Sequence, residues 1–224
     1  MPTKRSYVSP RREQAAAHTR ELILRSATGL FADRGYGRVT VGDIAAGAGV
    51  SPKTVFASLG SKSDILNEIV DAAVRDSGHE RALRSVRAAQ DPVAVLEAVA
   101  RGTRTGNESK YAVHEAIRKA LPSHEDGEVL WERATADYRA ALREAARRLH
   151  ALASLPYSQE ETADLLWFWF GPAGWRTLVA EAGWSWDRGG GGPPFPPPPP
   201  PPPPPPKQRV PGTHPHGETH LAFM

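Results

Sequence analysis

The chain has 224 residues, no cysteine and a formal net charge of +3. The lack of cysteine excludes disulfides, cysteine-based zinc sites and thiol chemistry, and the small net charge excludes a protein that binds nucleic acid over its whole surface. No apolar run approaches the ~20 residues that span a bilayer. The N-terminus also lacks the apolar core of a signal peptide, so we expect a cytoplasmic protein without a membrane segment.

The N-terminal segment is basic, and basic residues outnumber acidic ones through Arg38. Such an excess suits contact with DNA phosphates. A solubilising arm without DNA contact is the alternative for Lys4 to Arg12. We place a flexible arm and the start of a helix at residues 1–18. Apolar residues then recur at helical spacing, which predicts a first helix from Pro10 to Arg34.

Two short helices joined by a tight turn are predicted between Thr40 and Leu66. Thr40 is suited to cap the first of them, and Gly49 is suited to the left-handed conformation that ends it. Ser51 followed by Pro52 is a favourable start for the second helix. This arrangement is typical of a helix-turn-helix, which lays its second helix in the major groove of DNA.

The rest of the ordered chain is also predicted to be helical, because no segment alternates as a strand does. The expected helices are 61–77, an irregular one at 79–90, 91–101, 111–121, 125–153 and 158–183, with a loop or frayed end at 102–109. Val93 and Val129 are expected on buried faces. Pro172 is expected to bend the last helix. The fold class is therefore all-α.

The C-terminal segment 189–224 is rich in glycine and proline, with an unbroken proline run at 196–206. Such a run adopts polyproline II and cannot join a packed core, so we expect a disordered tail. His214, His216 and His220 have spacing that suits weak metal chelation. Because a disordered segment offers them no supporting shell, we expect no metal site and no cofactor.

Residues 19–66 resemble the DNA-binding domain of the TetR family of bacterial transcription regulators. The resemblance rests on ILRSATGLFADRGY at 23–36, TVGDIAAGAGVS at 40–51 and TVFASLGSKSDIL at 54–66. It implies that residues 67–188 form a helical ligand-binding and dimerisation domain. It also implies a homodimer that binds a palindromic double-stranded operator, represses transcription and responds to a small-molecule effector of unknown identity.

Family members normally end with one more amphipathic helix, where this chain has its glycine-proline tail. A reading-frame shift is the explanation we favour, and an acquired tail is the alternative. Absence of that helix would weaken the dimer. Two other functions therefore stay open: a DNA-binding protein that responds to no ligand, and an inactive regulator that cannot dimerise. No catalytic motif is present, so we expect no enzyme.

The resemblance and the helical spacing together select candidate DNA contacts. These are Thr40, Ser51, Lys53, Thr54, Phe56, Ala57, Ser58 and Lys62. Lys53 is the chief candidate, as a donor to guanine or to a phosphate. Phe56 stands where relatives have a tyrosine that contacts phosphate through its hydroxyl, so packing is an equal alternative for it. Capping alone is the alternative for Thr40 and Ser51.

An aromatic cluster follows at 167–175, and Trp167, Phe170 and Trp175 are its candidate ligand or dimer contacts. Four consecutive aromatic residues point in every direction around a helix, so they cannot all enter one core. We favour core packing and dimer contact over ligand contact for this cluster.

Overall fold

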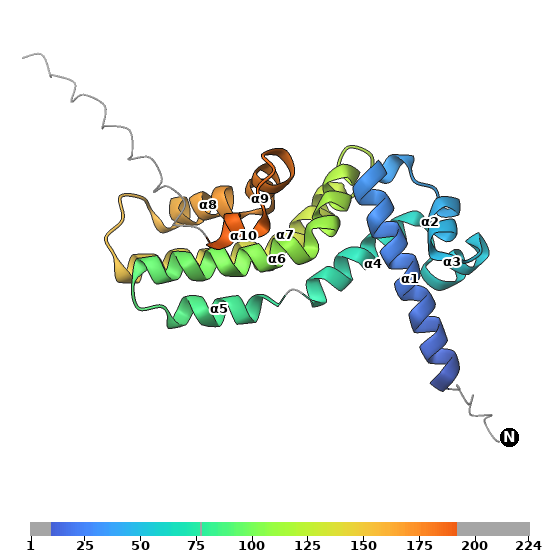
Figure 1. Cartoon of the computed structure of the whole chain (residues 1–224), viewed down its shortest axis with the longest axis horizontal. Coiled ribbons are helices and arrows are strands. Elements are labelled where there is room, and N and C mark those ends of the chain that lie inside the picture. The colour runs from blue at the N-terminus through green and yellow to red at the C-terminus, as the bar shows by residue number, and fades with distance from the viewer. Residues whose placement is uncertain (1–9, 77, 192–224) are drawn as a thin grey trace, which may run out of the picture.

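The computed structural model describes residues 10–76 and 78–191, and within these ranges it contains helices and no strand (Figure 1). The predicted all-α fold is therefore confirmed. Residues 1–9 and the proline run, with His214, His216 and His220, lie outside the described residues. The first residues of the predicted tail, by contrast, are helical, because α10 (Trp186–Gly191) continues into them.

The N-terminal part consists of four helices and one short 3-10 turn. They are α1 (Pro10–Arg34), the turn Tyr36–Arg38, α2 (Val41–Ala48), α3 (Pro52–Leu59) and α4 (Lys62–Arg75). Thr40 caps α2 as expected, and it does so in a capping box with Asp43: the Asp43 amide donates to the Thr40 hydroxyl at 3.1 Å, and the Thr40 amide donates to the Asp43 carboxylate at 2.8 Å. Gly49 takes the left-handed conformation with φ of 67°.

The C-terminal part is built around two long helices that lie side by side. Its elements are α5 (His79–Ala88), α6 (Pro92–Ala120), α7 (Gly127–Leu152), α8 (Gln159–Phe170), α9 (Pro172–Arg176), a π-helical turn (Thr177–Glu181) and α10. Figure 1 shows α6 and α7 running from α5 and α8 towards α1, and the C-terminal end of α6 packs against α1. The helix predicted as irregular, α5, is regular.

The predicted loop at 102–109 is wrong, because α6 passes through it without a break. Thr103 and Asn107 in this stretch are buried polar residues. The Asn107 amide donates to the Thr103 carbonyl at 2.8 Å and to the Tyr138 hydroxyl at 2.9 Å. The Trp175 indole donates to the Thr103 hydroxyl at 3.4 Å. Partners on α7 and α9 thus make burial of this polar stretch possible.

Three further expectations were wrong in detail. Val93 and Val129 are exposed, whereas Val95 and Leu130 are buried, because each expected valine lies at the edge of the face that its helix turns to the core. The helix predicted at 158–183 does not merely bend at Pro172. It ends at Phe170, and α9 begins as a separate helix after Gly171.

The hydrophobic core of the N-terminal part extends into the C-terminal part. It combines buried residues of α1 to α4 with Ala116, Ile117 and Ala120 of α6 and Leu130 of α7. A second core lies among α5, α6, α7 and α8. The first core therefore draws side chains from well beyond residue 66, where we expected the first domain to end.

Candidate nucleic-acid interface and effector cavity

Helix α3 lies at the end of the molecule away from α5 and α8 (Figure 1). Val55 and Leu59 are buried and hold it against the core, which leaves Lys53, Phe56 and Ala57 exposed. The exposed fraction of Phe56 is 55%. The packing alternative for this ring is therefore not supported, and the outer face of α3 is open to a partner.

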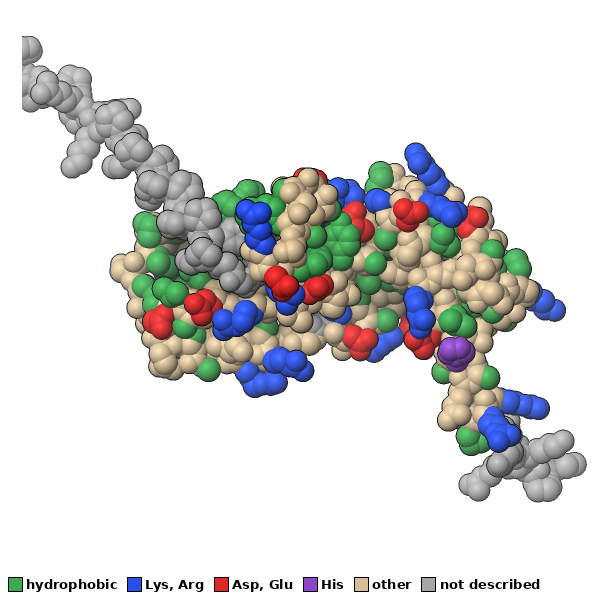
Figure 2. Space-filling model, viewed as in Figure 1, with side chains coloured by type: hydrophobic (Ala, Val, Ile, Leu, Met, Phe, Trp, Pro, Cys, Tyr) green, Lys and Arg blue, Asp and Glu red, His purple; other side chains and the backbone are tan. Residues whose placement is uncertain are grey.

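The C-terminal end of α3 is fixed by α1. Arg20 of α1 donates to the Ser58 carbonyl at 2.9 Å and forms an ion pair with Glu68 of α4 at 2.9 Å. Figure 2 shows other lysine and arginine side chains projecting from this end of the molecule, including near the start of α1. A fixed helix among exposed cations suits contact with a phosphate backbone.

The candidate hydroxyls at the helix starts are already engaged. The Thr40 hydroxyl donates to Asp43 at 2.6 Å, and these hydrogen bonds lower the pKa of the Asp43 carboxyl. The Ser51 hydroxyl accepts from the Thr54 amide at 3.1 Å and lies 2.9 Å from the Thr54 hydroxyl. The capping roles of Thr40 and Ser51 are thus confirmed, and a DNA contact by either stays a prediction.

The ammonium group of Lys62 is directed into the protein. It donates to the carbonyl oxygens of Tyr36 at 2.9 Å and Val39 at 3.0 Å, and lies 4.1 Å from the centre of the Tyr36 ring. Burial lowers the pKa of Lys62. This side chain therefore holds the turn before α2 against the start of α4. Only its backbone amide, in the first turn of α4, is placed to meet a phosphate.

Replacing Lys62 by methionine should lower the free energy of unfolding by ~1–3 kcal/mol, because two carbonyl groups lose a charged donor. Urea denaturation followed by circular dichroism measures the change. The matched control is Lys53→Met, in which the replaced lysine is exposed on α3, and it should leave stability unaltered. Equal stability of both variants and the parent chain would contradict a structural role for Lys62.

A polar junction that sequence reasoning missed joins the N-terminal part to the turn between α6 and α7. His124 packs edge-on against Tyr36, with ring centres 5.0 Å apart, and its Nε2 lies 2.8 Å from the Ser63 hydroxyl. Its Nδ1 accepts from the Asp126 amide at 3.1 Å, so in the neutral ring Nε2 carries the proton. Lys119 of α6 also donates to carbonyls at the end of α1.

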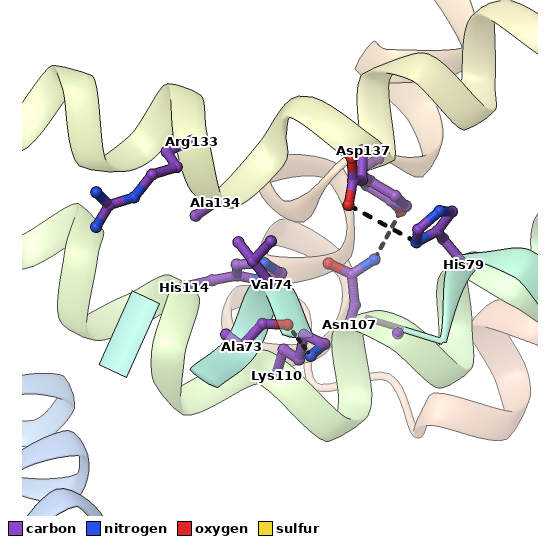
Figure 3. Close-up of a pocket in the computed structure, with 11 residues that line it drawn as sticks. Ala73, Val74, His79, Asn107, Lys110, His114, Arg133, Ala134 and Asp137 are labelled. Carbon is purple, nitrogen blue, oxygen red and sulfur yellow. Dashed lines mark hydrogen bonds and ion pairs between the residues drawn. The ribbon is translucent and has the colours of Figure 1, made fainter. Parts of the chain in front are cut away.

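One cavity lies where α4 and α5 meet α6 and α7, and hydrogen bonds and ion pairs cross it (Figure 3). Lys110 donates to the Ala73 carbonyl at 2.6 Å, Asn107 donates to Tyr138, and His79 lies 3.7 Å from Asp137. Burial lowers the pKa of Lys110 and raises that of Tyr138. These polar groups already hold helices together, so we assign this cavity a structural role.

A second cavity lies among α6, α7 and α9, with an empty volume of about 640 Å³ including its open mouth. Its polar wall comes from Glu115 and Arg118 on α6 and Arg176 on α9. Its apolar wall includes Trp131 and Trp175. A concave, mainly apolar site with a few convergent polar groups is typical of small-molecule binding.

Of the three candidate aromatic residues, only Trp175 lines either cavity. Trp167 packs edge-on against Tyr138 at 5.6 Å and lies under Arg139, while Phe170 is buried and its carbonyl accepts from the Tyr138 hydroxyl. Sequence reasoning did not select the charged groups of the second cavity. The E-x-x-R spacing at 115–118 was visible, but Arg176 is remote in sequence.

Two kinds of feature are absent from the described part of the chain. It holds no group of three or more histidine, aspartate or glutamate side chains placed to bind one metal ion. Among residues 10–76 and 78–191, no helix combines the length and the apolar character that crossing a bilayer requires.

Comparison with known families gives a match over α1 to α4. The model of bacterial regulatory proteins of the tetR family matches residues 23–69, which include the whole helix-turn-helix. A search of curated proteins gives no match.

Solved structures with the same arrangement include a candidate transcriptional regulator from Saccharomonospora viridis in complex with choline. It is 22% identical, with a TM-score of 0.60 over 77% of this chain and 91% of that chain. The hemolysin II regulator HlyIIR is 13% identical (TM-score 0.56, 75% and 93%). A candidate fatty acid metabolism regulator from Clostridium perfringens is 18% identical (0.55, 75% and 91%). These likenesses show that the fold is shared along most of each chain.

Proposed function

We infer that this chain, a TetR-type regulator by its helix-turn-helix at residues 23–69, controls transcription by placing α3 in the major groove of an operator. The observation that carries this inference is the open face of α3. Lys53, Phe56 and Ala57 are exposed there, while Val55 and Leu59 anchor the opposite face. A rigidly held short helix with an exposed cation near its N-terminus is the usual recognition element of a helix-turn-helix.

Each candidate residue has a distinct role in this proposal. Lys53 donates to guanine or to a phosphate, and Thr54 and Ser58 make short polar contacts. Phe56 and Ala57 offer apolar contact to a thymine methyl group. Thr40, Ser51 and Lys62 lie at helix starts, where backbone amides favour phosphate.

We further propose that the protein acts as a homodimer and a repressor. A two-fold dimer presents two recognition helices about 34–36 Å apart, which matches successive major grooves on one side of DNA. Phe168 on α8, 67% exposed, supports an interface on that helix. An effector that favours a different separation of the two recognition helices would weaken operator binding. The size of this effect is limited by the difference between the effector's affinities for the two conformations.

The test is an operator titration with a Lys53→Ala variant. The operator is first selected from random duplexes with the parent protein, and affinity is then measured by fluorescence anisotropy at several salt concentrations. Loss of a base or phosphate contact should weaken binding by ~1–3 kcal/mol, or about fivefold to 150-fold. If Lys53 holds a phosphate, the slope of the logarithm of the binding constant against the logarithm of salt concentration should also decrease in size by about one.

The matched control is Arg143→Ala, since Arg143 is exposed on α7 outside the N-terminal part. Its operator affinity should equal that of the parent protein. Selection that enriches no sequence, with equal binding to all duplexes, would overturn the regulator proposal and favour a non-specific DNA-binding protein.

A further inference from the structure

The second cavity has an unusual balance of charge. Glu115 is 8% exposed and accepts two hydrogen bonds from Arg118, at 3.0 and 2.8 Å. The Nε atom of Arg176 lies 3.0 Å from the same carboxylate. Burial alone would raise the pKa of Glu115, but Arg118 and Arg176 hold it below its ordinary value. In the cavity wall itself, one carboxylate thus faces two guanidinium groups, while Glu181 outside the wall pairs with Arg176.

Both arginines keep donors that the protein does not use. Arg118 bonds Glu115 through Nε and Nη2, and Arg176 bonds Glu181 through Nη1. Within the described chain, Nη1 of Arg118 and Nη2 of Arg176 have no hydrogen-bond partner. The two arginine side chains are 40% and 31% exposed. Guanidinium groups are well suited to recognise a carboxylate because they offer paired, parallel N–H donors.

The rest of the wall is apolar or uncharged. Trp131, Pro172 and Trp175 supply hydrophobic surface from α7 and α9. His114 also lines the cavity, and burial lowers its pKa to about 4, so the ring is neutral near pH 7. Its ring packs edge-on to Trp131 at 6.0 Å. Positive charge in this cavity is therefore confined to the two arginines.

We propose that this cavity binds an organic monocarboxylate with an apolar body. The ligand carboxylate accepts from the free N–H groups of Arg118 and Arg176, and the apolar body lies against Trp131 and Pro172. The role of this ligand as an effector rests on the proposed function of the protein. Its binding to the cavity does not depend on that function.

An organic cation does not fit the same wall. Glu115 is the only acidic residue lining the second cavity, and two arginines already neutralise it. A quaternary ammonium would therefore meet two guanidinium groups and no unpaired carboxylate, and would have to break the ion pairs of Glu115 with Arg118 and Arg176. The choline-bound neighbour from Saccharomonospora viridis shares the fold at 22% identity, and we expect this chain to differ from it in ligand charge.

The test uses three sets of probes on the full chain without DNA: 3-phenylpropanoate and octanoate, their uncharged amides, and choline with phenylpropyl-trimethylammonium. Calorimetric titration and melting scans measure binding. At least one carboxylate should bind and raise the melting temperature, with affinity at least tenfold above that of its amide. The two ammonium compounds should not bind. Equal affinity for carboxylate and amide, or binding of the cations alone, would overturn the proposal.

Variants then locate the binding. Arg176→Gln should weaken carboxylate binding at least tenfold and leave amide binding unaltered, while Arg143→Gln, at an exposed arginine of α7, should change neither. Glu115→Gln removes the competing negative charge and should tighten carboxylate binding several-fold. A role limited to holding the helices together would make Glu115→Gln bind more weakly. Circular dichroism confirms that each variant is folded before titration.

The outcomes separate this proposal from the function. Carboxylate binding in a protein that selects no operator would overturn the regulator proposal and leave the cavity assignment standing. Selective operator binding in a protein that binds neither carboxylate would overturn the cavity assignment alone.

Discussion

Phe31→Ala is expected to lower the free energy of unfolding by ~3–5 kcal/mol, the usual cost of deleting a buried aromatic ring. Phe31 is fully buried, and its ring centre lies 5.2 Å from that of Tyr36. It contributes to the core that α1 to α4 share with α6. Because domains are stable by only ~5–15 kcal/mol, operator binding should fall with the folded fraction. Urea denaturation and the operator titration measure the two effects.

The matched control for this change is Phe56→Ala, which deletes the same ring from an exposed position on α3. Its unfolding free energy should stay within about 0.5 kcal/mol of the parent value, as for most surface changes. Operator affinity should nevertheless decrease if Phe56 contacts a thymine. Comparable destabilisation by both variants would mean that Phe31 does not occupy the core described above.

Trp175→Ala should be similarly severe, at ~3–5 kcal/mol. Trp175 is 1% exposed, stacks on Trp186 with ring centres 5.6 Å apart, and donates to the Thr103 hydroxyl. Its loss leaves a void between α9, α10 and α6, and a buried hydroxyl loses a partner. The expected result is a lower midpoint in urea.

Trp184→Ala is the control for Trp175, since Trp184 is only half-buried and its ring lies 4.5 Å from the guanidinium of Arg188. Such a contact contributes about 0.5–1 kcal/mol at an exposed site. The midpoint should therefore shift much less than for Trp175→Ala. A shift of equal size would show that Trp175 has no special place in the packing.

The N-terminal helices were predictable because their signals are local. A capping box depends on two residues three positions apart, and a helix-ending glycine depends on its own φ. The capping box of Thr40 with Asp43 and the left-handed Gly49 at the end of α2 are therefore found in the structure as the sequence predicts. The open face of α3 was predictable for the same reason, since Val55 and Leu59 repeat at helical spacing.

The course of α6 could not be predicted because it depends on distant partners. Polar Thr103 and Asn107 favour a loop when the sequence is considered alone. In the fold they are satisfied by Tyr138 on α7 and Trp175 on α9. The second cavity was missed for a similar reason, since Glu115 and Arg176 meet only after α6 and α9 have packed.

The shared core has a consequence for the order of folding during synthesis. The helix-turn-helix and α4 leave the ribosome first, but their core also needs Ile117 and Leu130. At roughly 5–20 residues per second, the stretch between Val70 and Leu130 takes several seconds to translate. During that interval the part of this core that Ile117 and Leu130 complete lacks its cover from α6 and α7. The core of the N-terminal part, which carries the helix-turn-helix, is thus completed by residues of the C-terminal part, which is synthesised later.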